Sequence, residues 1–169
     1  CSTDGKIHIN NTTYAEAIVR QQYDFIYGGL VGLTTGATIE HCENNADITI
    51  SALCAQSVAT SGSHLYGLSF GGIVGAAELL DGGSATSISH VRNNGNVLLD
   101  NTSPLGRGYH WMGGVFGQTI NNNALSAFHH CYNYGSIKTI KDSAVSAIRV
   151  GGVFGNLAAN ENIGSCSFL

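Results

Sequence analysis

The chain has 169 residues, of which 43% are apolar, 11% are charged, 23 are glycine and one is proline. This composition excludes a disordered chain, and the length predicts one domain, residues 1–169, with a sizeable core. The formal net charge of -4 and seven scattered Lys and Arg residues argue against binding to nucleic acid, and no apolar run reaches the ~18 residues that would cross a bilayer.

The first seven residues introduce a motif that recurs along the chain. It has a small apolar residue first, Asn or Thr two positions later, Gly or Ala at the fifth position and Ile or Val at the seventh. Its copies begin at Cys1, Cys42, Val91 and Cys131, and a fifth begins at Cys166. A repeat of about 40 residues without helical periodicity, and rich in glycine and β-branched residues, is typical of a solenoid.

Each motif leads into an apolar segment such as Ile7-His-Ile9, which predicts a short strand. Thr13 and Glu16 form a capping-box pattern that predicts a short helix over 13–20. Residues 60–67, 104–108 and 118–124 are expected to be surface loops. A second signature, Gly-Gly-x-x-Gly, occupies 28–32, 71–75, 113–117 and 151–155, and an apolar residue stands three places before each later motif: Ile39, Ile88, Phe128 and Ile163.

These patterns predict an all-β fold, a parallel β-helix (β-solenoid) of about four repeats with about three apolar segments each. Equivalent strands would stack in parallel about 4.8 Å apart, so that like residues form columns. The motif's Asn and Gly positions are expected at a corner, where they tolerate left-handed backbone and where Asn amides form a ladder. The paired glycines predict a bend that a Cβ would crowd.

The five cysteines are an odd number without Cys-x-x-Cys spacing, so a zinc site is weakly indicated. Four of them occupy the first motif position, and Val91 occupies that position in the remaining copy. A position that accepts Cys or Val favours buried thiols, because free Cys behaves as a small apolar residue. A disulfide between neighbouring copies is the alternative, although parallel side chains are poorly aimed for it.

Three histidines, His41, His90 and His130, precede the first motif position in successive copies. Stacked imidazoles are one way to hold Zn or Cu, but a residue beside an inward Cys is expected to face solvent. The carboxylates of Glu40, Glu43 and Asp47 cluster, but their counterparts in other copies are not acidic. We therefore expect no catalytic residues, no metal site and no cofactor.

Aromatic residues before the paired glycines are candidates for a sugar-stacking strip. Their period-two spacing predicts that most belong to the core, while Trp111 is expected to be exposed. The set comprises Phe25, Tyr27, Phe70, Tyr109 and Trp111.

Gly-Gly-[Leu/Ile/Val]-[Val/Phe]-Gly followed by x-[Ile/Phe]-x-x-Cys-x-Asn-x-Gly-x-[Ile/Val] resembles the GLUG-type repeat over nearly the whole chain. That repeat occurs in secreted and surface proteins of bacteria, including adhesins and non-catalytic parts of immunoglobulin-A-cleaving metallopeptidases. The resemblance implies a parallel β-helix in an extracellular or cell-surface setting. It implies no peptidase activity, because the sequence contains no His-Glu-x-x-His. Thr3, Ala46 and Val91 depart from the pattern.

The resulting expectation is a structural or adhesive module without catalysis. Its partners would be neighbouring repeats of a larger chain, or copies of itself stacked end to end as a filament, with a host or matrix glycan or protein as a further partner. The alternatives are a glycan-binding module and a polysaccharide-active β-helix enzyme.

Overall fold

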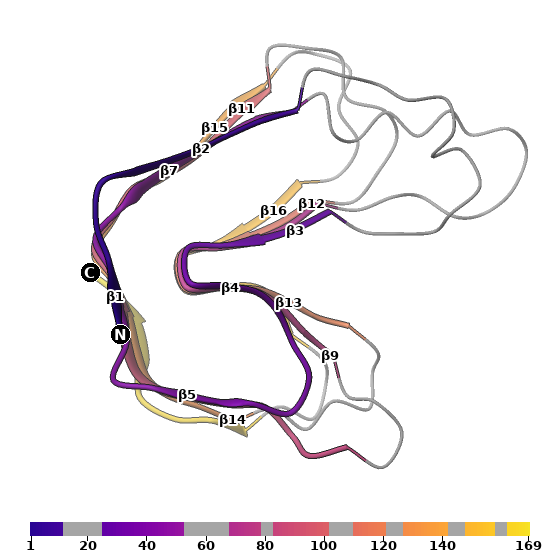
Figure 1. The fold of residues 1–169 in the computed structure, drawn as a ribbon, viewed down its shortest axis with the longest axis vertical. Helices are drawn as coiled ribbons and strands as arrows, with labels where there is room; N and C mark the ends of the chain where they lie inside the picture. Colours follow the sequence, from indigo (N-terminus) through magenta and orange to yellow (C-terminus); the bar gives the residue numbers. More distant parts are fainter. Residues whose placement is uncertain are drawn as a thin grey trace, which may run out of the picture.

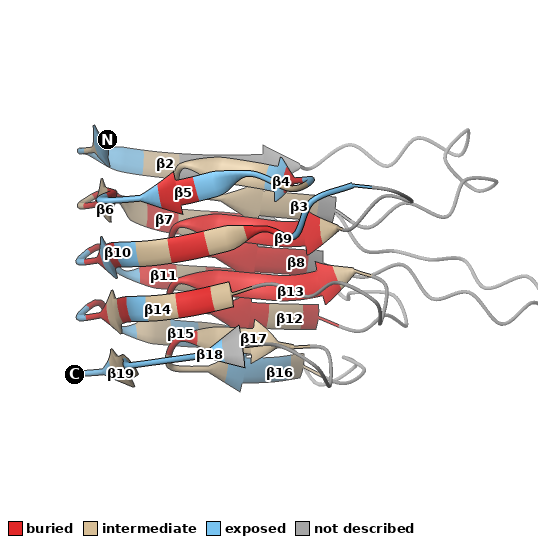
Figure 2. Cartoon of the chain, turned by 90° about the horizontal axis from the view of Figure 1, so that it is seen from below, coloured by how far each residue is buried: buried red, intermediate tan, exposed pale blue. Residues whose placement is uncertain are grey.

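The structure is a computed structural model that describes residues 1–11, 25–52, 68–78, 83–101, 110–120, 127–141, 148–157 and 162–169. Within these ranges the chain is all-β, without a helix, and its strands pair in parallel in four sheets. Seen end on, equivalent strands lie behind one another (Figure 1), and seen from the side they form successive layers (Figure 2). The predicted helix at 13–20 and the predicted loops at 60–67 and 104–108 lie outside the described residues.

The four sheets are named here A to D. Sheet A contains β1 (Ser2–Thr3), β5 (Thr38–Glu40), β6 (Glu43–Asn44), β10 (Ser87–Asn93), β14 (Ala127–Asn133), β18 (Asn162–Ile163) and β19 (Cys166–Phe168). Sheet B contains β2 (Lys6–Asn11), β7 (Asp47–Ala52), β11 (Val97–Asn101) and β15 (Ile137–Lys141). Sheet C contains β3 (Phe25–Gly28), β8 (Leu68–Gly71), β12 (His110–Gly113) and β16 (Ile148–Gly151). Sheet D contains β4 (Val31–Thr34), β9 (Val74–Glu78), β13 (Phe116–Ile120) and β17 (Phe154–Asn156).

The strand register pairs the positions that the sequence motif equates. In sheet A, Cys131 pairs with Val91 on one side and with Cys166 on the other. In sheet B, the seventh motif positions form the row Ile7, Ile48, Val97 and Ile137. This arrangement of parallel, stacked strands is consistent with a β-solenoid.

The Gly-Gly segment separates two sheets, so the expectation of about three strands per copy is wrong. Chain direction reverses at the paired glycines, between sheet C and sheet D, and the bend points inward (Figure 1). A Cβ on Gly71 would collide with the carbonyl oxygen of Val74 across the bend, and one on Gly72 would lie 2.5 Å from Cγ of Asn93. The glycines therefore allow the bend to close, as predicted, and they also allow it to approach the opposite corner.

The corner opposite the bend carries the predicted amide ladder. Asn44 Nδ2 donates a hydrogen bond to Asn93 Oδ1 at 2.6 Å, and Asn93 Nδ2 donates to Asn133 Oδ1 at 2.7 Å. Thr3 Oγ1 donates to Asn44 Oδ1 at 2.5 Å, which extends the ladder into the first copy. The three Asn side chains are fully buried, so these bonds satisfy amides that water does not reach.

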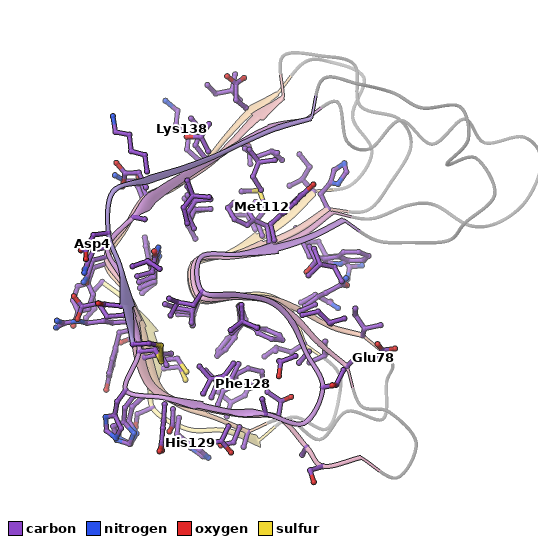
Figure 3. All side chains as sticks on the ribbon, in the orientation of Figure 1. Asp4, Glu78, Met112, Phe128, His129 and Lys138 are labelled. Atoms are coloured by element: carbon purple, nitrogen blue, oxygen red, sulfur yellow. A yellow bond between two sulfur atoms is a disulfide. The ribbon has the colours of Figure 1, made fainter. Side chains whose placement is uncertain are left out.

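The bend and the Asn ladder divide the interior into two apolar cores. One core lies between sheets A and D and includes Ile88, Val91, Phe116 and Phe128. The other lies between sheets B and C and includes Ile48, Phe70, Leu99 and Met112. Phe128 and Met112 point into the two lobes of the cross-section in Figure 3.

Two expectations about local structure are corrected. Of the motif's Asn and Gly positions, only Gly5 has left-handed backbone, with φ 96°. Outside the motif, the backbone is left-handed at Gly36 and at the three histidines that precede the later copies. Position 95 requires glycine for a steric reason, because a Cβ there would collide with the carbonyl oxygen of Ala46. The loop expected at 118–124 does not begin at 118, because β13 continues to Ile120 and pairs with β9; residues 121–124 lie outside the described residues.

Candidate functional site

The outer surface of sheet A carries a row of three exposed histidines with left-handed backbone. His41, His90 and His130 have φ values of 51°, 52° and 54°. Successive rings stack, with centroids 4.9 and 4.5 Å apart and interplanar angles of 19° and 10°. The expectation that these side chains face solvent is confirmed.

The cause of this backbone conformation lies in the spacing of the buried residues. Ile88 and Val91 are both buried, although a regular strand turns every second side chain to the same face. One extra residue must be absorbed between them, and left-handed His90 absorbs it as a bulge does. The apolar residue three positions before each motif was thus a sequence signal for the bulge, but its meaning was missed.

The stacked geometry does not suit metal binding. The rings lie face to face, so their in-plane nitrogen lone pairs point in parallel and do not converge on one point. In the described ranges, no group of three or more His, Cys, Asp or Glu side chains is placed to hold a metal ion. The metal hypothesis for His41, His90 and His130 therefore gains no support.

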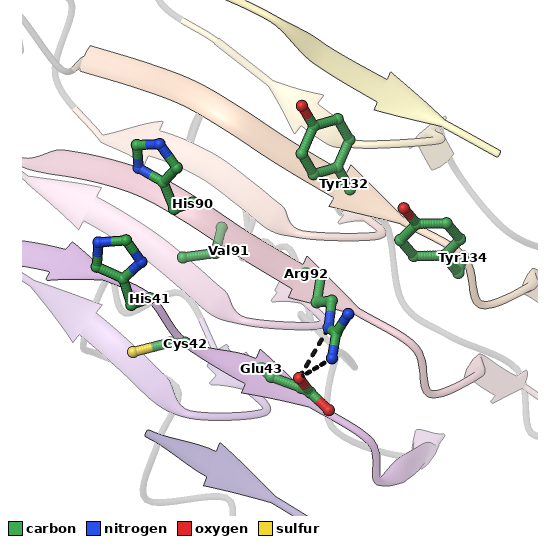
Figure 4. A pocket seen from close by; sticks show the side chains of 8 residues that line it. All are labelled: His41, Cys42, Glu43, His90, Val91, Arg92, Tyr132 and Tyr134. Atoms are coloured by element: carbon green, nitrogen blue, oxygen red, sulfur yellow. Dashed lines mark hydrogen bonds and ion pairs between the residues drawn. The ribbon is translucent and has the colours of Figure 1, made fainter.

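Beside the histidine row lies a surface pocket of about 430 Å³ (Figure 4). It crosses three successive copies, since its lining comes from β6, β10 and β14 and from the residues next to them. The lining residues are His41, Cys42, Glu43, His90, Val91, Arg92, Tyr132 and Tyr134. The pocket thus combines aromatic faces with charged hydrogen-bonding groups on a surface that runs along the stack.

An ion pair occupies one side of this pocket. Arg92 Nε donates to Glu43 Oε2 at 2.7 Å, and Arg92 Nη2 donates to the same oxygen. Hydrogen bonding to Arg92 lowers the pKa of the exposed Glu43 carboxyl. The pair joins strands β6 and β10, whose residues 43 and 92 are register partners. Glu43 is therefore held as an anion beside a cation, a poor environment for a general acid.

The other two acidic candidates, Asp47 and Glu40, have different surroundings. Asp47 Oδ1 accepts hydrogen bonds from the backbone N–H and the Nδ2 of Asn96, at 2.8 and 2.9 Å. Asn96 Oδ1 in turn accepts from Ser136, so Asp47 belongs to an outer polar ladder between copies. Glu40 is exposed at the end of β5.

The aromatic strip is only partly formed. Phe70 is fully buried, and Tyr27 packs against the core between sheets B and C. Trp111 is half-buried between the buried His110 and Met112, so the expectation that it is exposed is only partly met. The side chain of Phe25 and the whole of Tyr109 lie outside what the structure describes. Exposed aromatic side chains are described instead at Tyr134, in the pocket, and at Phe168, in the last copy.

His110 is a buried ionisable group that the sequence did not single out. Its side chain is fully buried in β12, an inner strand of sheet C, and neither ring nitrogen has a hydrogen-bond partner among the described residues. Burial lowers the pKa of His110 from 6.5 to about 4. Its alternation with Met112 on the strand was the available signal for an inward position.

The cysteine column departs from the expectation of buried free thiols. Cys1 and Cys42 form a disulfide with Cα atoms 4.6 Å apart, joining β1 to β6 across adjacent copies. Parallel neighbours are therefore close enough to bond, which the argument from side-chain direction underestimated. Cys131, which is buried, and Cys166, which is half-buried, are free thiols, in line with the expectation.

No protein-family model matches the chain, and neither curated proteins nor solved structures give a significant match. Within the described ranges, no helix has the length and apolar character needed to span a membrane.

Proposed function

We propose that the chain is a β-solenoid that acts as a non-catalytic structural or adhesive module of an extracellular or cell-surface protein and stacks end to end. The observation that carries the proposal is the exposed end of the stack. In the last copy, at the bottom of the stack in Figure 2, the columns that are buried in the interior continue onto residues that are half-buried or exposed.

Three register pairs show the contrast between interior and end. Met112, Phe128 and Asn133 are fully buried, while their partners in the last copy are about half exposed. Those partners are Val150 at 50%, Ile163 at 49% and Phe168 at 55%. An apolar face bordered by unpaired strand edges favours addition of another parallel layer.

A further layer of the same cross-section would cover this face, supplied either by a neighbouring repeat of a larger chain or by the first copy of a second molecule. Such a head-to-tail contact does not close and produces a filament. The resemblance of the motifs to GLUG-type repeats supports the surface setting, and the structural use of Glu43 and Asp47 supports a module without catalysis.

Sedimentation velocity and electron microscopy over a concentration series test the stacking. The wild-type chain is expected to form longer particles as concentration rises. Val150→Lys places a charge on the end face and is expected to keep the chain monomeric. Tyr134→Lys is the matched control, because Tyr134 is 51% exposed on the lateral surface and its replacement leaves stacking intact. A wild-type chain that stays monomeric at every concentration would refute end-to-end stacking.

A second candidate function is glycan binding, which the lateral pocket favours. Tyr132 and Tyr134 offer aromatic faces, while Arg92 and Glu43 offer a donor and an acceptor for sugar hydroxyls (Figure 4). Screening against a glycan array, with Tyr134→Ala and Trp111→Ala compared, tests this candidate. Loss of binding on Tyr134→Ala alone would support the pocket, and loss on Trp111→Ala alone would favour the aromatic strip.

A further inference from the structure

The cysteine column contains two equivalent pairs separated by a valine. Cys1 and Cys42 begin neighbouring copies and are bonded. Cys131 and Cys166 also begin neighbouring copies and are direct Cα partners in the pairing of β14 with β19. Val91 pairs with Cys131 on its other side, so Cys166 is the cysteine partner that the register offers to Cys131 in this column.

The second pair has the geometry that the first pair uses. Parallel neighbours are spaced about 4.8 Å apart, and a disulfide accepts Cα separations of roughly 4.4 to 6.8 Å. Cys131 Sγ lies 3.7 Å from the carbonyl oxygen of Ile88, and Cys166 Sγ lies 3.7 Å from the carbonyl oxygen of Phe128. Ile88 and Phe128 are equivalent positions of the preceding copies, so the two sulfur atoms lie in equivalent places. The neighbouring Cys166 also contributes to the raised pKa of the Cys131 thiol, as expected of two thiols that lie close together.

We propose that Cys131 and Cys166 form a second disulfide between adjacent copies, made by exchange with a low-molecular-weight disulfide such as oxidised glutathione. The half-buried Cys166 reacts first: its thiolate attacks one sulfur of the oxidant, and one thiol leaves. The Cys131 thiolate then attacks the Cys166 sulfur of this mixed disulfide and releases the second thiol. Two protein thiols are oxidised, one small disulfide is reduced to two thiols, and the protons of Cys131 and Cys166 pass to those products.

The order of these steps follows from burial. Burial raises the pKa of the Cys131 thiol, and the neighbouring Cys166 raises it further. Cys131 is therefore a poor first nucleophile, because the thiolate is the reactive form. As the second nucleophile it attacks a sulfur that the strand register already holds beside it, so proximity compensates for its low thiolate fraction.

The two bonds would lie at the two ends of sheet A. β1 has two residues and β19 has three, and each pairs with a strand on one side only. Between the two cysteine pairs, the column holds Val91 in β10, which has seven residues and pairs on both sides. The two disulfides would tie each terminal strand to its neighbour, while the middle of the column holds an apolar side chain.

Peptide mapping by mass spectrometry tests the assignment. The chain carrying Cys54→Ser, which leaves four cysteines, is equilibrated with reduced and oxidised glutathione, alkylated and digested without reduction. The expected result is two linked peptide pairs, Cys1 with Cys42 and Cys131 with Cys166, and loss of all four alkylatable thiols. Cys131 and Cys166 both alkylated while Cys1–Cys42 is closed would overturn the proposal. A link from Cys131 or Cys166 to Cys1 or Cys42 would also overturn it, as would a link to Cys54 in the natural sequence.

A thermal measurement separates the bond from simple packing. Cys166→Ser is expected to lower the melting temperature relative to its parent under oxidising conditions, and to lower it much less once both proteins are reduced. An equal loss under both conditions would assign Cys166 a packing role alone and overturn the proposal.

Discussion

Replacing Asn93 by Ala is expected to be the most damaging single change to the Asn ladder. Asn93 is fully buried; its Oδ1 accepts from Asn44 at 2.6 Å, and its Nδ2 donates to Asn133 Oδ1 at 2.7 Å and to the Gly95 carbonyl at 2.8 Å. Each bond contributes about 1 kcal/mol net, and a buried partner left without a donor costs about 1–3 kcal/mol more. The expected loss is therefore about 4 kcal/mol, a large share of the roughly 5–15 kcal/mol that stabilises a domain.

The neighbouring Asn94 supplies a matched control. Its Nδ2 also bonds to an Asn of the adjacent copy, Asn45 Oδ1 at 2.6 Å, but this bond is exposed. Asn94→Ala is expected to change the free energy of unfolding by less than about 0.5 kcal/mol. Urea unfolding followed by circular dichroism gives both values. Similar losses in the two variants would show that burial of the ladder contributes nothing, and the reasoning would be wrong.

Other predictions concern the bend, the buried histidine and the disulfide. Gly72→Ala is expected to cost about 3 kcal/mol in urea unfolding, whereas Gly32→Ala should be nearly neutral, because its new Cβ finds its nearest neighbour 3.5 Å away. Since the folded-state pKa of His110 is about 4 against 6.5, protonation favours the unfolded chain. Stability should then fall by about 3 kcal/mol as pH drops from 6.5 to 4, and His110→Leu should flatten that pH profile. Cys1→Ala removes a bond that closes 41 residues, so it should cost up to about 4 kcal/mol, a difference that must vanish when wild type and variant are both reduced.

Much of the strand register was accessible from sequence because each motif position repeats one residue type. Pairing of Ile7 with Ile48 and of Val91 with Cys131 follows from aligning the copies, and so does the Asn ladder. Those inferences need only the premise that like residues stack. The inward direction of the bend was less accessible, because glycine pairs show where Cβ atoms are excluded but not which part of the chain excludes them.

The pocket and the disulfide were not accessible in the same way. Glu43, Arg92 and Tyr132 occupy the same motif position in three successive copies, so aligning the copies places them side by side. That position does not repeat one residue type, however, so nothing in the sequence marks it as the lining of a pocket. The bond between Cys1 and Cys42 depends on side-chain rotation within a short Cα distance, which spacing along the chain does not encode.

The amide ladder has a consequence for how the molecule opens. Each interior rung is held by the rung above and the rung below, while a terminal rung is held from one side. Amide hydrogen exchange should therefore be slowest at Asn93 and faster toward both ends of the stack. Unfolding would then begin in the terminal copies and proceed toward the middle.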